Sequence, residues 1–155
     1  MPRWTKGESA IQGWLEAEKL QQVPAPEGVA NDLLETARRH LASAEKILAD
    51  DPEGALTLAY DAARKAAAAL LAHQGLRATS DGGHVVVADA MKAQFGDIPG
   101  IRSLNRLRIR RNEVEYPKQD YDPADETEAA EAIEVAHQTI SAADSLLAED
   151  LLGVF

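Results

Sequence analysis

The chain has 155 residues, 45% of them hydrophobic and 27% charged, which is the composition of one globular domain with a hydrophobic core. Its 26 acidic residues outnumber its 16 basic ones, and the formal net charge of −10 disfavours broad nucleic-acid binding while leaving room for a local basic patch. The absence of cysteine excludes disulfides and thiol chemistry, and without a long apolar run or an apolar signal core we expect a cytoplasmic protein outside the membrane.

The first 28 residues differ in character from the rest of the chain. Residues 9–23, SAIQGWLEAEKLQQV, predict a short amphipathic helix capped by Ser9, and PAPEG at 24–28 predicts a turn or linker. We therefore expect an N-terminal arm, residues 1–28, and a helical bundle, residues 29–155. Trp4 and Trp14 in the arm either pack back on the bundle or dock as partner-binding residues on another subunit or protein.

Two long helices are expected at the start of the bundle. Asn31 is a candidate cap for the first, which carries one apolar stripe of Leu34, Ala37, Leu41, Ala44 and Leu48. Asp51 and Pro52 begin the second in the way typical of a cap followed by proline. This second helix, roughly residues 52–74, is rich in alanine, so neighbouring helices can approach it closely, and Gly75 is its natural stop.

Three shorter segments complete the predicted fold. Residues 76–84 form a loop, and the spacing of apolar residues from Val85 to Phe95 predicts a short helix, although three consecutive valines are also compatible with a strand. A fourth helix is expected at about 101–116, and a last helix starts at Asp122 and Pro123. The sum is an all-α, antiparallel four- to five-helix bundle with a short N-terminal helical arm.

Basic residues concentrate on the predicted fourth helix. Five of the 16 Lys and Arg residues lie between 102 and 111. Arg111 continues an apolar stripe where a leucine would be expected, so its guanidinium needs a partner or a wet cleft. Either Arg111 pairs with Glu115 or with an acidic residue on another helix, or it binds an anion together with Asn112, with Tyr116 as a wall. In the second case three further arginines supply phosphate or nucleic-acid contacts: Arg106, Arg108 and Arg110.

The segment RRNEVEYP, residues 110–117, resembles the signature of the HEPN-domain superfamily, an Arg followed by a polar residue and then a His four to six residues later. LAYDAARKAAAALLAHQGLRATSDGGH, residues 58–84, also resembles the second helix and following loop of that family. The resemblance covers about residues 29–149. It implies a homodimer in which two motif helices form one cleft. It also implies a role in toxin–antitoxin, defence or stress systems, often beside a nucleotidyltransferase-type antitoxin, and either metal-independent ribonuclease activity or binding of RNA or nucleotides without turnover.

Tyr116 stands where the family has its histidine. A phenol with a pKa near 10 is a poor general base at neutral pH, so either cleavage is weak or lost or another residue takes the proton. His84, at the start of a predicted helix that keeps its imidazole neutral, is the candidate, the alternative being a simple contact to the loop. The candidate catalytic set is thus Arg111, Asn112, Tyr116 and His84. No residues show metal-ligand spacing, and no cofactor is expected. A scaffold dimer with a structural Arg111 is the remaining alternative.

Overall fold

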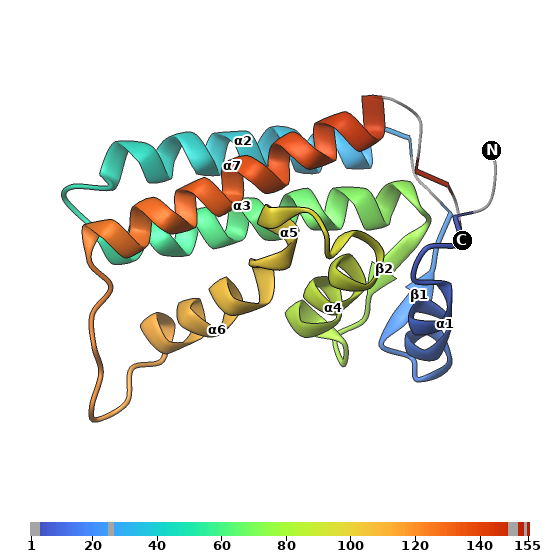
Figure 1. Ribbon diagram of the computed structural model, residues 1–155, viewed down its shortest axis with the longest axis horizontal. Coiled ribbons are helices and arrows are strands. Elements are labelled where there is room, and N and C mark those ends of the chain that lie inside the picture. The colour runs from blue at the N-terminus through green and yellow to red at the C-terminus, as the bar shows by residue number, and fades with distance from the viewer. Residues whose placement is uncertain (1–3, 25–26, 149–151, 154) are drawn as a thin grey trace.

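The computed structural model describes residues 4–24, 27–148, 152–153 and 155. Two long helices and a third laid along them form the upper layer of the molecule, and shorter helices cover one side (Figure 1). The elements in chain order are α1 (Glu8–Glu16), β1 (Leu20–Gln22), α2 (Val29–Ile47), α3 (Pro52–His73), β2 (Leu76–Ala78), α4 (Gly83–Phe95), α5 (Pro99–Arg102), α6 (Leu104–Glu115) and α7 (Glu126–Ala148).

Helix α3 is the centre of the fold, and α2, α4, α6 and α7 all pack against it. Most of its buried residues are alanines, so its neighbours approach closely, as the sequence predicted: Ala55, Ala59, Ala62, Ala63, Ala66, Ala67 and Ala69. The prediction of an all-α helical bundle is confirmed. Within the bundle α2 and α3 form an antiparallel hairpin, whereas α7 runs in the same direction as α3 because α4, α5 and α6 intervene between them (Figure 1).

The start of α3 follows the sequence prediction. The Asp51 carboxylate accepts a hydrogen bond from the Gly54 amide at 2.9 Å, and Pro52 takes the first helical position. At the other end Gly75 adopts a left-handed conformation, with φ of 78°, directly after the last turn. The alanine-rich helix is thus fixed at both ends by local chemistry.

Other predicted caps are wrong. Ser9 and Asn31 lie inside α1 and α2, because left-handed glycines, Gly7 and Gly28, turn the chain into each helix earlier. Helix α7 begins at Glu126 rather than near Asp122, and the carboxylate of Asp125 accepts from the Glu128 amide at 2.8 Å. The expected fourth helix is two helices, since α5 ends at Arg102 and α6 begins at Leu104.

The N-terminal segment is tied to the bundle by a short ribbon. Predicted helix 9–23 ends at Glu16, and three of its residues form β1, which pairs antiparallel with β2 where a loop was expected. A ribbon of two three-residue strands has too little sequence pattern to be predicted. The α1 side chain of Ile11 is fully buried, so this segment shares the core of the bundle. The boundary at residue 28 stays a prediction.

The crossing of α5 over α7 offers a test of the packing. A Cβ added to Gly100 would lie 2.7 Å from the Gln138 Cβ and 2.8 Å from the Thr139 backbone nitrogen. We expect Gly100→Ala to lower the free energy of unfolding by about 1–3 kcal/mol, measured by urea denaturation, because the two helices must move apart.

Gly13→Ala in α1 is the matched control, because nothing lies within 4 Å of a Cβ at that position. It should leave stability unchanged or raise it by up to about 1 kcal/mol, since alanine is the better helix former. Equal effects of the two substitutions would contradict the tight crossing.

Candidate functional site

Tyr60 in the middle of α3 brings two of the predicted catalytic residues together. Its hydroxyl is hydrogen-bonded to His84 Nδ1 at 3.0 Å, and the two rings are 5.7 Å apart. The guanidinium carbon of Arg111 lies 5.9 Å from the centre of the same Tyr60 ring. His84 comes from α4 and Arg111 from α6, so three helices contribute to what we call the Tyr60 cluster: Tyr60, His84 and Arg111.

Tyr60 is held firmly, because it is the largest of the fully buried side chains and only 2% exposed. Burial raises the pKa of its phenol to about 12, although the charges of Arg64, Arg108 and Arg111 act in the opposite direction. The hydroxyl therefore stays protonated at neutral pH. It is a neutral hydrogen-bonding partner for the imidazole.

His84 reaches the cluster through the two glycines that precede it. A Cβ on Gly82 would lie 2.1 Å from the Lys19 carbonyl oxygen, and Gly83 has a left-handed backbone with φ of 53°. Partial burial and then the positive charges of Arg64 and Arg111 lower the pKa of His84 below its usual value, so the imidazole is neutral at pH 7. His84 is nevertheless exposed to solvent at the surface of the site.

Arg111 is half-buried and makes no ion pair with any residue that the structure describes. Its Nη1 donates to the Asn112 side-chain oxygen at 3.4 Å, and its Nε–H is buried with no partner in the described chain. The structure thus lacks the expected alternative pairing with Glu115. A guanidinium without a carboxylate partner, over the same tyrosine ring that bonds a neutral imidazole, is suited to hold an anion.

Asp61, the residue after Tyr60 on α3, is the acidic partner of several neighbouring basic side chains. Its carboxylate accepts hydrogen bonds from His40 Nδ1 at 2.6 Å, from Arg64 Nη2 at 2.7 Å and from Lys65. Burial opposes ionisation, but the hydrogen bonds and charges of Lys65 and Arg64 prevail and lower the pKa of Asp61 to about 2. Asp61 therefore fixes Arg64 and Lys65, and it leaves the charge of Arg111 uncompensated.

A model of the HEPN domain family matches residues 30–146, more than half of the chain, and the match contains the whole Tyr60 cluster. The chain belongs to the HEPN-domain family. Searches of curated proteins and of solved structures gave no match. The matched region of this HEPN protein runs from the start of α2 to the end of α7 and leaves α1 and β1 outside it.

The structure separates the arginines predicted to bind phosphate. Arg108 is hydrogen-bonded to Asn105 at 3.1 Å, and its charge acts on Tyr60 and His84. Arg110 instead pairs with Glu128 at 2.8 Å and Glu113 at 3.1 Å. It also donates to the Asp122 carbonyl oxygen at 2.8 Å.

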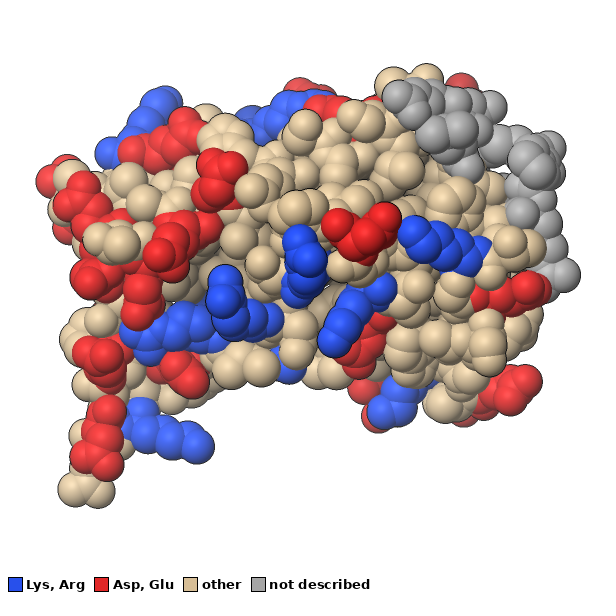
Figure 2. All heavy atoms as spheres, in the orientation of Figure 1, with Lys and Arg blue, Asp and Glu red and all other residues tan. Residues whose placement is uncertain are grey.

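Arg106 lines a hollow between α6 and α7 together with Arg110 and Glu128. Lys and Arg form a row along α5 and α6 on the face shown in Figure 2, and Asp and Glu gather at the left end of that face. Acidic side chains therefore lie next to one end of the row of Lys and Arg. Of the three arginines, only Arg108 belongs with the Tyr60 cluster.

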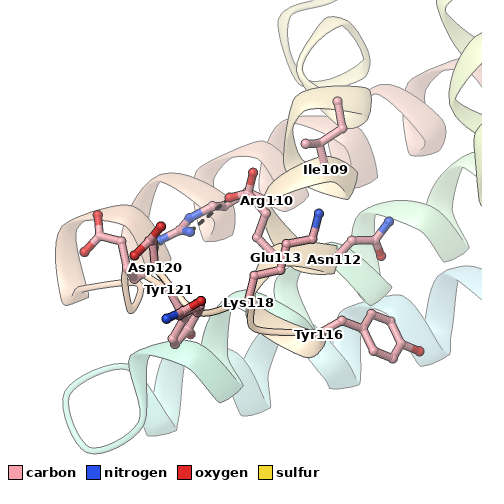
Figure 3. A pocket seen from close by; sticks show the side chains of 10 residues that line it. Ile109, Arg110, Asn112, Glu113, Tyr116, Lys118, Asp120 and Tyr121 are labelled. Carbon is pink, nitrogen blue, oxygen red and sulfur yellow. Dashed lines mark hydrogen bonds and ion pairs between the residues drawn. The ribbon is translucent and has the colours of Figure 1, made fainter.

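Tyr116 does not join Arg111 in the way that the motif suggested. It caps the C-terminal end of α6 and is 70% exposed, and no hydrogen bond or ring contact links it to Arg111 or His84 in the described chain. It lines a hollow of about 810 Å³ between the end of α6 and the following loop, with Asn112 and Ile109. In that hollow the Tyr116 ring points away from Arg110 and Tyr121 (Figure 3).

The tryptophans of the N-terminal segment contact the core of their own chain. The Trp4 ring lies 5.5 Å from Phe95, and Trp14 is partly buried against the same core. Docking on a partner through these residues stays a prediction. Among the described residues no group of three or more potential ligands could hold a metal ion, and no helix is long and apolar enough to cross a membrane.

Tyr60, Asp61 and Arg64 are parts of the site that were not predicted from the sequence. A signal was available, because the sequence YDAARK places one aromatic and three charged residues in the middle of an alanine-rich helix. Charged residues on a helix that is otherwise buried must find partners across its surface. The sequence did not show which helices would supply those partners.

The electrostatics of the cluster are open to direct measurement. We expect the pKa of His84, followed by NMR, to lie below 6.5, so that the ring takes up a proton only in more acid solution. Arg111→Gln should raise this pKa, because one of the positive charges that disfavour protonation is removed. Arg39→Gln, on the exposed face of α2, is the control and should leave it unchanged. If the pKa of His84 is the same in Arg111→Gln as in the wild type, the charge of Arg111 does not act on His84, and the arrangement of the cluster is contradicted.

Asp61 should make stability depend on pH in acid solution. Its pKa of about 2 in the folded protein is below the unfolded value of 3.8, so the carboxylate stabilises the fold above pH 3.8 and loses this effect as pH falls through 2. We expect Asp61→Asn to lower the free energy of unfolding by about 1–2 kcal/mol at pH 7, with partial exposure limiting the effect. The difference from the wild type should shrink towards pH 2.

Asp50→Asn is the control for that comparison, because Asp50 is exposed and its side chain makes no bond with the described residues. Its unfolding curves should follow those of the wild type at every pH. A constant destabilisation of Asp61→Asn from pH 7 to pH 2 would rule out the ionic explanation.

Proposed function

We propose that the Tyr60 cluster binds a phosphate group of RNA and that this HEPN protein cleaves the chain there. The observation that carries the proposal is the guanidinium of Arg111, unpaired with any carboxylate of the described chain, which lies over the ring of Tyr60 while the hydroxyl of that ring is hydrogen-bonded to a neutral histidine. Arg108 adds a second positive charge to the same cluster. Arginine suits phosphate because two parallel N–H groups match two phosphate oxygens.

His84 replaces the histidine that the motif lacks at Tyr116. A proton on Nδ1, donated to the Tyr60 oxygen, leaves the lone pair of Nε2 free to accept the proton of a ribose 2′-hydroxyl. The 2′-oxygen then attacks phosphorus, the bond from phosphorus to the 5′-oxygen breaks, and water gives that oxygen its proton. Arg111 stabilises the negative charge that grows on the phosphate. Tyr116 takes no part in the proton transfers.

The assembly that we propose is the homodimer common in the family, in which the exposed end of α6 faces its copy. Ile109 and Tyr116 are large hydrophobic side chains exposed on that helix, at 47% and 70%. A toxin–antitoxin, defence or stress system with a nucleotidyltransferase-type antitoxin is the cellular setting. Finding a gene for such a partner beside this one would support the assignment.

One observation favours a second candidate, a scaffold dimer in which Arg111 is structural. The guanidinium carbon lies over the Tyr60 ring, a contact that stabilises a protein by itself. In that case Arg111→Lys and Arg111→Ala change the melting temperature, and neither changes any binding or cleavage of RNA.

The proposed activity is tested with purified protein and total RNA in the presence of a chelator. We expect cleavage by the wild type and a loss of about 100-fold or more in Arg111→Ala and in His84→Ala, since each removes a group that acts in the transition state. Tyr60→Phe should show an intermediate loss because the imidazole loses its orienting partner. Rates are read from a labelled RNA on a gel.

Arg102→Ala is the matched control, because it removes the same charge from the same region at an exposed position outside the cluster. It should cleave like the wild type. Binding without cleavage by the wild type would show a phosphate-binding module without turnover. Absence of both RNA binding and cleavage in wild-type protein would contradict the proposal and leave the scaffold.

A further inference from the structure

A second hollow lies beside the Tyr60 cluster, between α3 and the ribbon. Its volume is about 730 Å³, within the range of about 300–1,000 Å³ common for small-molecule sites. The wall is formed by the two residues that follow β1, the first two turns of α2, the second half of α3, β2 and one side chain of α4. We call it the α3–β2 groove.

The groove and the Tyr60 cluster are neighbours along the same helices. On α3, Arg64 and Ala68 line the groove and follow Tyr60 at intervals of four residues, which places all three on one face. On α4, Val87 lines the groove three residues after His84. The groove therefore begins about one helical turn from Tyr60 on α3.

Alanines create the space. Ala68 and Ala72 lie on α3 beside Leu71, and their methyl groups leave room where larger side chains would fill the groove. The opposite side is supplied by Val29 and Leu33 of α2. The result is a slot with an aliphatic surface that suits an apolar ligand body.

Arginine is the only charged residue type among the described residues that line the groove, although the whole chain is strongly acidic. Arg77 on β2 is exposed, and Arg64 on α3 is half-buried. Asp61 holds one end of the Arg64 guanidinium, but its Nε–H is buried and has no partner in the described chain. Arg64 is thus held at one end and keeps hydrogen-bonding capacity that the described chain does not use.

We propose that the α3–β2 groove binds a small amphipathic anion, a carboxylate on an aliphatic or aryl body. The carboxylate pairs with Arg64, and the body lies over Ala68, Ala72 and Leu71. The two arginines that line the groove match the carboxylate of such a ligand. The aliphatic residues, with no carboxylate among the described lining, match its apolar body. The site is distinct from the RNA phosphate site, and it does not depend on the proposed function.

Occupancy of the groove also alters the neighbouring cluster. Arg64 is the first among the charges that disfavour protonation of His84. A bound carboxylate neutralises that charge, so the pKa of His84 rises when the groove is filled. Through this effect a ligand of the groove controls the fraction of neutral His84.

The test uses octanoate as the probe and octanamide as its uncharged counterpart. We expect saturable octanoate binding in isothermal titration and in NMR shifts of groove residues, and at least tenfold weaker binding of octanamide. Ala68→Leu fills the slot and should weaken octanoate tenfold or more, as should Arg64→Gln. Ala142→Leu on α7 and Arg39→Gln on α2 make the same chemical changes outside the groove and should bind like the wild type.

Three results would each overturn the proposal: no saturation of the wild type at millimolar octanoate, equal binding of octanamide, or equal binding by Ala68→Leu and Ala142→Leu. A His84 pKa that stays constant while octanoate saturates would place the anion away from Arg64 and would also overturn it. If Ala68→Leu does not fold by circular dichroism, Ala72→Leu replaces it. None of these measurements uses RNA, so their failure is separate from failure of the proposed function.

Discussion

The close approach of helices to the alanine surface of α3 is the constraint on which the rest of the structure depends. Small side chains allow α2 and α7 to pack closely along α3, and α4 and α6 also contact it. Tyr60 interrupts that surface with one large buried ring. Because close packing leaves a protein interior few voids, the ring fixes the positions of whatever lies against it, and these are His84 and Arg111.

Electrostatics then decide which of the clustered basic residues remain available. Glu128 and Glu113 engage Arg110, and Asp61 engages Lys65 and one end of the Arg64 guanidinium. Arg110 and Lys65 therefore contribute mainly to structure. Arg111 has no such partner in the described chain, and its guanidinium lies over the ring of Tyr60, whose hydroxyl is hydrogen-bonded to a neutral imidazole. A protein with a net negative charge can in this way have a positive electrostatic potential around Arg111, although its net charge alone would not predict one.

The same distribution connects the two proposed sites. Arg64 belongs to the Asp61 network, borders the α3–β2 groove and acts on the charge of His84. An anion bound in the groove would therefore change the proton affinity of His84 without any change of backbone. Coupling of this kind needs only that both ligands respond to one charge, which a single helix turn of α3 provides.

The sequence by itself determined the helical class, the alanine-rich central helix, its Asp51–Pro52 start and Gly75 stop, and the arginine motif of the family. These features follow from local chemistry and from periodicity, which a single sequence displays. The partners of Arg110, the placement of Tyr116 outside the cluster and the role of Tyr60 were decided by tertiary structure. They depend on which helices meet, and residues brought together from positions 60, 84 and 111 share no local pattern that marks them as neighbours.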